Sequence, residues 1–186
     1  MNYECGTWPE PLREVPQWVT WQYSKGRKQP NSIFADTENT YSWSDPSNWG
    51  TFSEARNTAR KVPYLEGVGF ILQNQSEPYR EPADGFILID FDDVRDPESG
   101  SMHPVAKRYV NQAGTYADVS TSGTGVHLLG RAILPDGVRT IQDELPEREE
   151  WPGAEIEVYD GKRFTAMTGY HITDSPSEVT DVQEFV

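Results

Sequence analysis

The segment Phe86–Asp92, FILIDFD, constrains the fold most, because a continuous apolar run ends in two aspartates. Side chains alternate between the two faces of a strand. Asp90 and Asp92 therefore continue the face that Phe86 and Leu88 begin, and the other apolar residues form the opposite face. The segment predicts a strand inside a sheet, with two carboxylates on one face at its end.

The rest of the chain alternates short apolar runs with helical patterns. We expect strands at 18–23, 67–73, 126–129, 155–159 and 164–168, and helices at 52–62 and 101–113. Thr51 and Glu54 have the spacing of a capping box for the first helix. Residues 136–145 are a candidate short helix. This order predicts an α+β fold with an antiparallel or mixed sheet.

The length of 186 residues is that of one domain. We expect a catalytic domain over 1–173, followed by an acidic tail or the start of a linker over 174–186. Cys5 is the only cysteine, which excludes intrachain disulfides and cysteine-based zinc sites. No apolar run approaches the ~18–20 residues of a membrane span, and the N-terminus lacks a signal-peptide pattern. A cytoplasmic protein with no membrane partner is expected.

The composition is strongly acidic, with 30 Asp and Glu against 16 Lys and Arg, for a formal net charge of −14. Nucleic-acid binders usually have basic surfaces, so this balance argues against such a partner. An acidic surface also suits a halophilic protein, because at ~1 M salt the Debye length of ~3 Å screens self-repulsion. In that case local clusters of charge decide the function.

Asp90 and Asp92 are the first such cluster. Two carboxylates ~5 Å apart at an effective dielectric of ~20 repel each other by roughly 3 kcal/mol. A divalent cation bound by both carboxylates would remove this repulsion, so the pair is a candidate metal site. The alternative is a solvated strand end that runs into an acidic turn.

The second cluster is the segment Ser120–His127, STSGTGVH. Gly123 and Gly125 permit backbone conformations that leave N–H groups pointing outward, as in phosphate-binding concavities. His127 follows at the start of a strand and can donate a hydrogen bond to an anionic oxygen. A purely structural turn is the alternative.

The third cluster lies within residues 155–164, EIEVYDGKRF. Glu155 and Glu157 share one face of a strand, and a tight turn then presents Lys162 and Arg163. Carboxylates and cations in one hairpin suit a metal-bound polyphosphate. Two solvated acids on an exposed sheet face are the alternative.

In this order, the three clusters resemble the three motifs of the archaeo-eukaryotic primase superfamily, in particular the primase-polymerase domains of viruses and mobile elements. Residues 16–21 (PQWVTW), the expected loop 26–30 (GRKQP) and residues 67–70 (GVGF) extend the resemblance over most of 15–170. The resemblance implies an RRM-like sheet with flanking helices and an N-terminal α/β extension.

The resemblance also implies an activity, template-directed nucleotidyl transfer with Mg²⁺ or Mn²⁺, in replication of a virus, mobile element or archaeal replicon. The implied partners are a single-stranded DNA template, nucleoside triphosphates and a helicase acting in cis or in trans. The metal ligands would be Asp90, Asp92 and Glu157, with Glu155 as an alternative to Glu157. Nucleotide contacts are expected from Ser122, Gly123, Gly125, His127, Lys162 and Arg163. Asp118 stands where many relatives carry Glu.

Two other functions remain compatible with the sequence. A metal-dependent nuclease needs the same acids but no triphosphate site, and it would degrade DNA without nucleotides. A catalytically silent nucleic-acid-binding module of a replication complex would keep the fold without binding metal at the acids.

Overall fold

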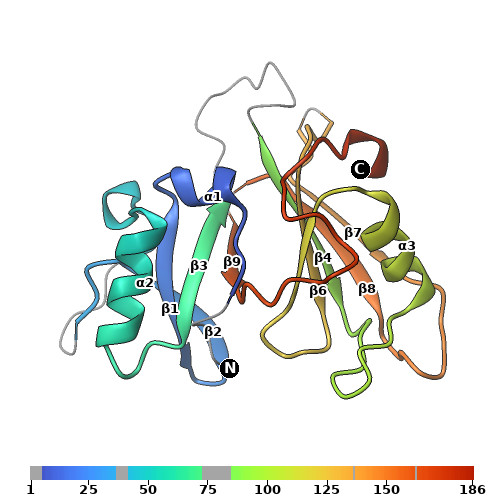
Figure 1. Cartoon of the computed structure of the whole chain (residues 1–186), viewed down its shortest axis with the longest axis horizontal. Helices are drawn as coiled ribbons and strands as arrows, with labels where there is room; N and C mark the ends of the chain where they lie inside the picture. The colour runs from blue at the N-terminus through green and yellow to red at the C-terminus, as the bar shows by residue number, and fades with distance from the viewer. Residues whose placement is uncertain (1–5, 37–41, 73–84, 136, 162) are drawn as a thin grey trace.

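The computed structural model describes residues 6–36, 42–72, 85–135, 137–161 and 163–186. Within these ranges the strands form two antiparallel sheets that lie side by side, with α1 and α2 beside the first and α3 beside the second (Figure 1). The helices are α1 (Glu10–Glu14), α2 (Phe52–Lys61) and α3 (Pro104–Gln112). The first sheet has the order β2-β1-β3-β9, from β1 (Trp18–Ser24), β2 (Arg27–Asn31), β3 (Gly67–Leu72) and β9 (Arg163–Met167).

The second sheet has the order β5-β6-β4-β8-β7. Its strands are β4 (Phe86–Asp92), β5 (Tyr116–Val119), β6 (Val126–Arg131), β7 (Thr140–Glu144) and β8 (Glu155–Tyr159). The α+β composition and the antiparallel sheets agree with the sequence analysis. The more detailed expectations, an RRM-like sheet and an N-terminal extension, stay predictions.

Helix α2 begins at the predicted capping box. The Thr51 hydroxyl accepts a hydrogen bond from the Glu54 amide, and the Glu54 carboxylate accepts one from the Thr51 amide. Phe52 then packs edge-on against Trp18 of β1, with ring centroids 4.8 Å apart. The helix thus covers one face of the first sheet.

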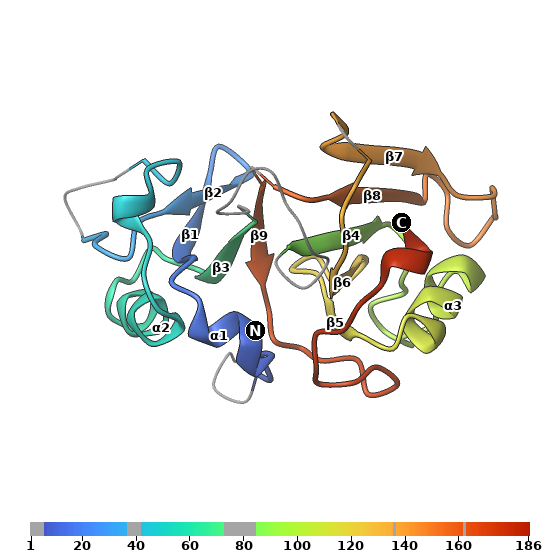
Figure 2. The same ribbon diagram turned by 90° about the horizontal axis from the view of Figure 1, so that it is seen from above.

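In the described part of the chain, no α-helix covers the opposite face of the first sheet (Figure 2). Alternation along β1 and β3 points Val19 and Ile71 to this face, where they form a small core cluster with Trp49. Phe164 of β9 packs on the cluster, with its ring over Gly69, where an added Cβ would lie 2.0 Å from the ring. We call this face the helix-free face.

The second sheet is asymmetric in the way that the segment Phe86–Asp92 predicts. Ile87, Ile89 and Phe91 pack in one cluster with Ala106 and Val110 of α3, and all five are buried. The other face of β4 carries Leu88 and the two aspartates. The predicted helix at 101–113 is confirmed as α3, although His103 rather than an earlier residue caps its first turn.

Two local predictions are wrong. Residues 136–145 contain no helix among the described positions; instead they contain the edge strand β7, paired with β8. All five residues of β7 are exposed, so no alternating pattern marked it as a strand. The Gly26–Pro30 segment, expected as a loop, forms β2 after a two-residue turn in which Lys25 and Gly26 both have positive φ.

The last residues of the chain lie along the second sheet. The Tyr116 amide donates to the Glu178 carbonyl, the Arg131 amide donates to the Thr180 carbonyl, and Val182 is 1% exposed. These contacts lie beyond the boundary predicted at residue 173, which stays a prediction. In the described part of the chain, the helices are too short and too polar to cross a lipid bilayer.

Candidate active site

Four side chains form a polar row across the second sheet. In the strand register, Asp118 of β5 is opposite His127 of β6, His127 is opposite Asp90 of β4, and Asp90 is opposite Glu157 of β8. Directly opposed residues point to the same face of an antiparallel pair. The three predicted motifs therefore meet because their strands are neighbours, although the residues are far apart in the sequence.

The acidic end of the row is a cluster of three carboxylates. One oxygen each from Asp90, Asp92 and Glu157 lies within 4.8 Å of the others. Asp90 is 9% exposed, and its buried Oδ1 atom accepts no hydrogen bond from the described residues. The pKa of Asp92 is raised to about 6, first by burial and then by the charge of Asp90, with a smaller contribution from Glu157.

Glu155, the alternative third acid, has a different environment. It lies opposite Asp92 in the register, but its Oε2 atom accepts a hydrogen bond of 3.0 Å from Gln142 of the edge strand β7. The cluster of three close carboxylates contains Glu157 and not Glu155. The choice of Glu157 as third metal ligand stays a prediction, and this geometry supports it.

Glu157 has two further partners from the β8–β9 hairpin. The Tyr159 hydroxyl donates to Glu157 Oε2 over 2.5 Å, and Arg163 Nη2 lies 3.6 Å from the same oxygen. The Arg163 guanidinium also stacks on the Tyr159 ring, 4.1 Å from its centroid. Arg163 thus lies beside Glu157, and its nucleotide contact stays a prediction. Lys162 lies outside the described residues.

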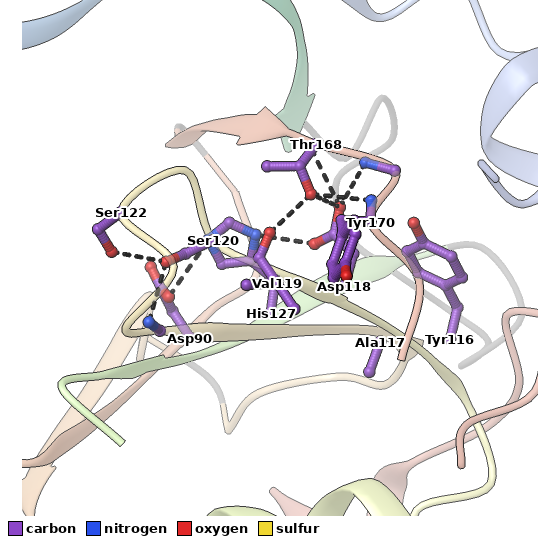
Figure 3. Close-up of polar contacts among 12 residues, drawn as sticks. Asp90, Tyr116, Ala117, Asp118, Val119, Ser120, Ser122, His127, Thr168 and Tyr170 are labelled. Atoms are coloured by element: carbon purple, nitrogen blue, oxygen red, sulfur yellow. Dashed lines mark hydrogen bonds and ion pairs between the residues drawn. The ribbon is translucent and has the colours of Figure 1, made fainter. Parts of the chain in front are cut away.

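His127 is held from behind by a buried carboxylate (Figure 3). Its Nδ1 atom lies 3.0 Å from Asp118 Oδ1, and its Nε2 atom lies 3.6 Å from Asp90 Oδ1. Burial alone lowers the pKa of His127, but the carboxylates of Asp90 and Asp118 outweigh burial, so the pKa is raised. The imidazole therefore presents Nε2 to the acidic cluster.

Asp118 is fully buried and uses its second oxygen on another segment. Oδ2 accepts hydrogen bonds from the amides of Thr168 and Gly169 and from the Thr168 hydroxyl (Figure 3). No role for Asp118 was predicted from the sequence. The sequence feature that could have indicated a role for Asp118 is its position between two apolar residues, Ala117 and Val119. A carboxylate that is buried in a strand needs partners.

The glycine-rich segment is a closed turn. The amides of Gly123 and Gly125 donate to the carbonyl and hydroxyl of Ser120, respectively, and not outward. Ser122 Oγ lies 2.9 Å from the hydroxyls of both Ser120 and Thr124. Nucleotide contacts by Ser122, Gly123 and Gly125 stay predictions.

A cavity of about 360 Å³ lies between the two sheets. Asp90 and His127 line it from the second sheet, and Lys28, Arg163 and Phe164 line it from the first. Lys28 contributes to the electrostatics of both Asp92 and His127 across this cleft. Lys28 was not predicted as a site residue, because its place in the cleft depends on how the two sheets lie in the folded chain and not on a local sequence pattern.

The chain has a relative among known proteins. Over 161 residues, 85% of its length, the chain is 30% identical to the DNA primase-polymerase of Nitratiruptor phage NrS-1. The chain is similar to a primase-polymerase. The similarity spans 20% of the phage protein, so the chain corresponds to about a fifth of that length. No family model matches the chain.

The acidic cluster fits the divalent ion that the resemblance to primase-polymerases implies. Three carboxylates offer only oxygen ligands, the donor type that Mg²⁺ and Mn²⁺ prefer. No described residue donates a hydrogen bond to the buried Oδ1 atom of Asp90, and a cation would give this oxygen a partner. The pKa of Asp92 is raised first by burial and then by the charge of Asp90, and a bound cation would oppose both effects.

Proposed function

We propose that the chain catalyses template-directed nucleotidyl transfer as a DNA primase or DNA polymerase module. The observation that carries the proposal is the position of three close carboxylates opposite cations in one cleft. Asp90 and His127 line the cleft from the second sheet, and Lys28 and Arg163 line it from the first. The carboxylates of Asp92 and Glu157 lie beside that of Asp90. A metal-bound triphosphate needs both kinds of group.

Asp90, Asp92 and Glu157 would hold two Mg²⁺ or Mn²⁺ ions. Such ions activate the 3′-hydroxyl of the growing strand and stabilise charge on the leaving pyrophosphate. In the reaction, the 3′-oxygen forms a bond to the α-phosphorus while the bond from that phosphorus to the pyrophosphate oxygen breaks. The side chains supply the position and charge that this displacement requires.

The other residues of the cleft would bind and orient the triphosphate. His127 donates from Nε2 to a phosphate oxygen, with Asp118 holding the ring in place. Arg163 and Lys28 offset the phosphate charge from the first sheet. Because the two sheets contribute separate groups, nucleotide binding would join them across the cleft.

The test is a gel assay on a single-stranded DNA template with labelled nucleotides, with and without a primer, in Mg²⁺ and in Mn²⁺. We expect products that lengthen only when nucleotides and metal are present, and none from the Asp92→Ala variant. Degradation of the template without nucleotides would indicate a nuclease. Template binding without synthesis and without metal binding would indicate a silent module.

A further inference from the structure

One stretch of this acidic chain contains no acid. Thirty of the 186 residues are Asp or Glu, yet residues 15–35 include neither, and Lys25, Arg27 and Lys28 stand within that stretch. The net charge of this stretch is therefore positive, opposite in sign to the formal net charge of −14 of the whole chain. An anionic partner would meet a favourable potential here and an unfavourable one from the protein as a whole.

The fold concentrates these cations at the tip of the β1–β2 hairpin. Lys25 and Gly26 form the two-residue turn, with φ of 51° and 75°, and Lys25, Arg27 and Lys28 are all exposed. Strand β2 is the edge of the first sheet (Figure 2). A tight hairpin turn holds the three cations in place better than a long loop would.

An exposed aromatic ring accompanies the cations. Tyr23 is 51% exposed and lies directly opposite Lys28 in the register, on the same face. Its ring contacts Trp21 edge-on at 5.2 Å, and Trp21 is 2% exposed, so a buried residue supports the exposed ring. We call Tyr23, Lys25, Arg27 and Lys28 the hairpin surface.

The hairpin surface is continuous with the candidate active site. Lys28 belongs to both, because it lines the cleft together with Asp90 and His127. Tyr23 lies on the helix-free face, which also carries Phe164 of the cleft. A nucleic-acid strand that runs from the acidic cluster along this face would therefore reach the hairpin.

We propose that the hairpin surface binds single-stranded nucleic acid and guides the template to the cleft, an inference that rests on the proposed function. Cations neutralise the phosphates, and an exposed aromatic side chain stacks on an unpaired base. Bases in a duplex are already stacked on one another and do not offer their faces. The combination of Tyr23 with three cations therefore selects single strands over duplex.

The experiment measures binding of a fluorescein-labelled oligothymidine by anisotropy, in EDTA and without nucleotides. Tyr23→Ala should weaken binding by roughly 5- to 150-fold, the range for loss of one base-stacking side chain. At any one salt concentration, Lys25→Gln with Arg27→Gln should change the slope of log affinity against log salt by about +1.4 relative to the wild type, for two lost phosphate contacts. Lys28 is left intact because it also lines the cleft.

Two controls match these changes on other parts of the described surface. Phe34→Ala removes an aromatic ring of similar exposure, 55%, between two residues that pack in other clusters. Arg60→Gln with Lys61→Gln removes the same charge from exposed positions at the end of α2, on the helix-covered side. Both controls should bind as the wild type does, and thermal melts should show all variants folded.

The proposal is overturned if folded Tyr23→Ala and Lys25→Gln/Arg27→Gln variants bind like the wild type, or if the α2 variant changes the salt slope equally. Preference for duplex over single strand would also overturn it. Asp92→Ala separates the two proposals, because it should lose synthesis and keep binding. Wild-type binding through the hairpin without any synthesis would reject the proposed function alone.

Discussion

The Nδ1 atom of His127 lies 3.0 Å from Oδ1 of Asp118, and both side chains are almost completely buried. Asp118 thereby fixes the plane of the imidazole and directs Nε2 to Asp90. The same carboxylate holds the Thr168–Gly169 segment that follows β9. One buried group thus connects the first sheet to the histidine of the second.

Asp118→Asn should weaken nucleotide binding through His127. The Asn oxygen is needed by the Thr168 and Gly169 donors, so its amide group would donate to Nδ1. The imidazole would then be neutral with its proton on Nε2, and it would bind phosphate without the positive charge that the Asp118 carboxylate favours. A double-mutant cycle with His127→Ala, read out as nucleotide affinity, should give a coupling of about 0.5–3 kcal/mol. Equal losses from Asp118→Asn in both backgrounds would mean that Asp118 acts only as a structural support.

His127→Ala should weaken binding of the nucleotide more than binding of the template. A hydrogen bond to a charged group contributes ~1.5–3 kcal/mol, so nucleotide affinity should fall by roughly ten- to hundredfold. Titration of nucleotide and of oligonucleotide on the same variant checks this. Unchanged nucleotide affinity with a lower melting temperature would support the structural-turn alternative.

Asp90→Ala, Asp92→Ala and Glu157→Ala should each abolish incorporation and leave the fold intact. In metal-free buffer the melting temperature of Asp92→Ala should equal or exceed that of the wild type, because this change relieves repulsion within the cluster, whereas Glu157→Ala also removes the partner of Tyr159 and Arg163. Glu155→Ala is the matched control, since Glu155 binds Gln142 and lies outside the cluster. If Glu155→Ala loses incorporation while Glu157→Ala keeps full activity, the third metal ligand is Glu155 and not Glu157.

The metal-free protein should lose stability as pH rises from about 4 to about 6. The pKa of Asp92 is about 6 in the fold against 3.8 for an unperturbed group, so the native state binds more protons in that window. Asp92→Asn should remove this slope in chemical denaturation. The raised pKa of His127 affects stability at higher pH. The stabilising contribution of this histidine is complete below pH ~6.5 and is lost as the pH rises above that value. An unchanged slope in Asp92→Asn would contradict the assignment.

Affinity for a single-stranded template should depend weakly or non-monotonically on salt, and synthesis should survive near molar salt. Few cations are available for phosphate contacts, and salt also screens the net charge of −14 over distances beyond ~3–10 Å. Anisotropy from roughly 0.05 to 2 M KCl measures this. A steep fall, with no synthesis above about 0.3 M, would reject salt adaptation.

The sequence predicted the elements that have strong local signals. The alternation in Phe86–Asp92 and the capping box at Thr51 are local rules, and both are confirmed by the structure. The edge strand β7 was missed because its five residues are all exposed, so it is defined by pairing with β8 and not by a pattern of its own.

The site was only partly predictable for a similar reason. Spacing within β4 placed Asp90 and Asp92 on one face, and the cluster with Glu157 agrees with this. The partnership of Asp118 with His127 depends on which strands are neighbours, and Lys28 enters the cleft from the other sheet. Both are tertiary relationships that no short stretch of sequence contains.

The polar row also determines where related chains are free to change length. Its four members meet only through the registers of β5, β6, β4 and β8, and a one-residue insertion inside a strand turns every following side chain to the other face. An insertion within β4 between Ile87 and Asp90 would break the row at once. Insertions in the loops between these strands leave the row intact. Among homologues, gaps should therefore be common between the motifs and should be excluded from the strands that carry them.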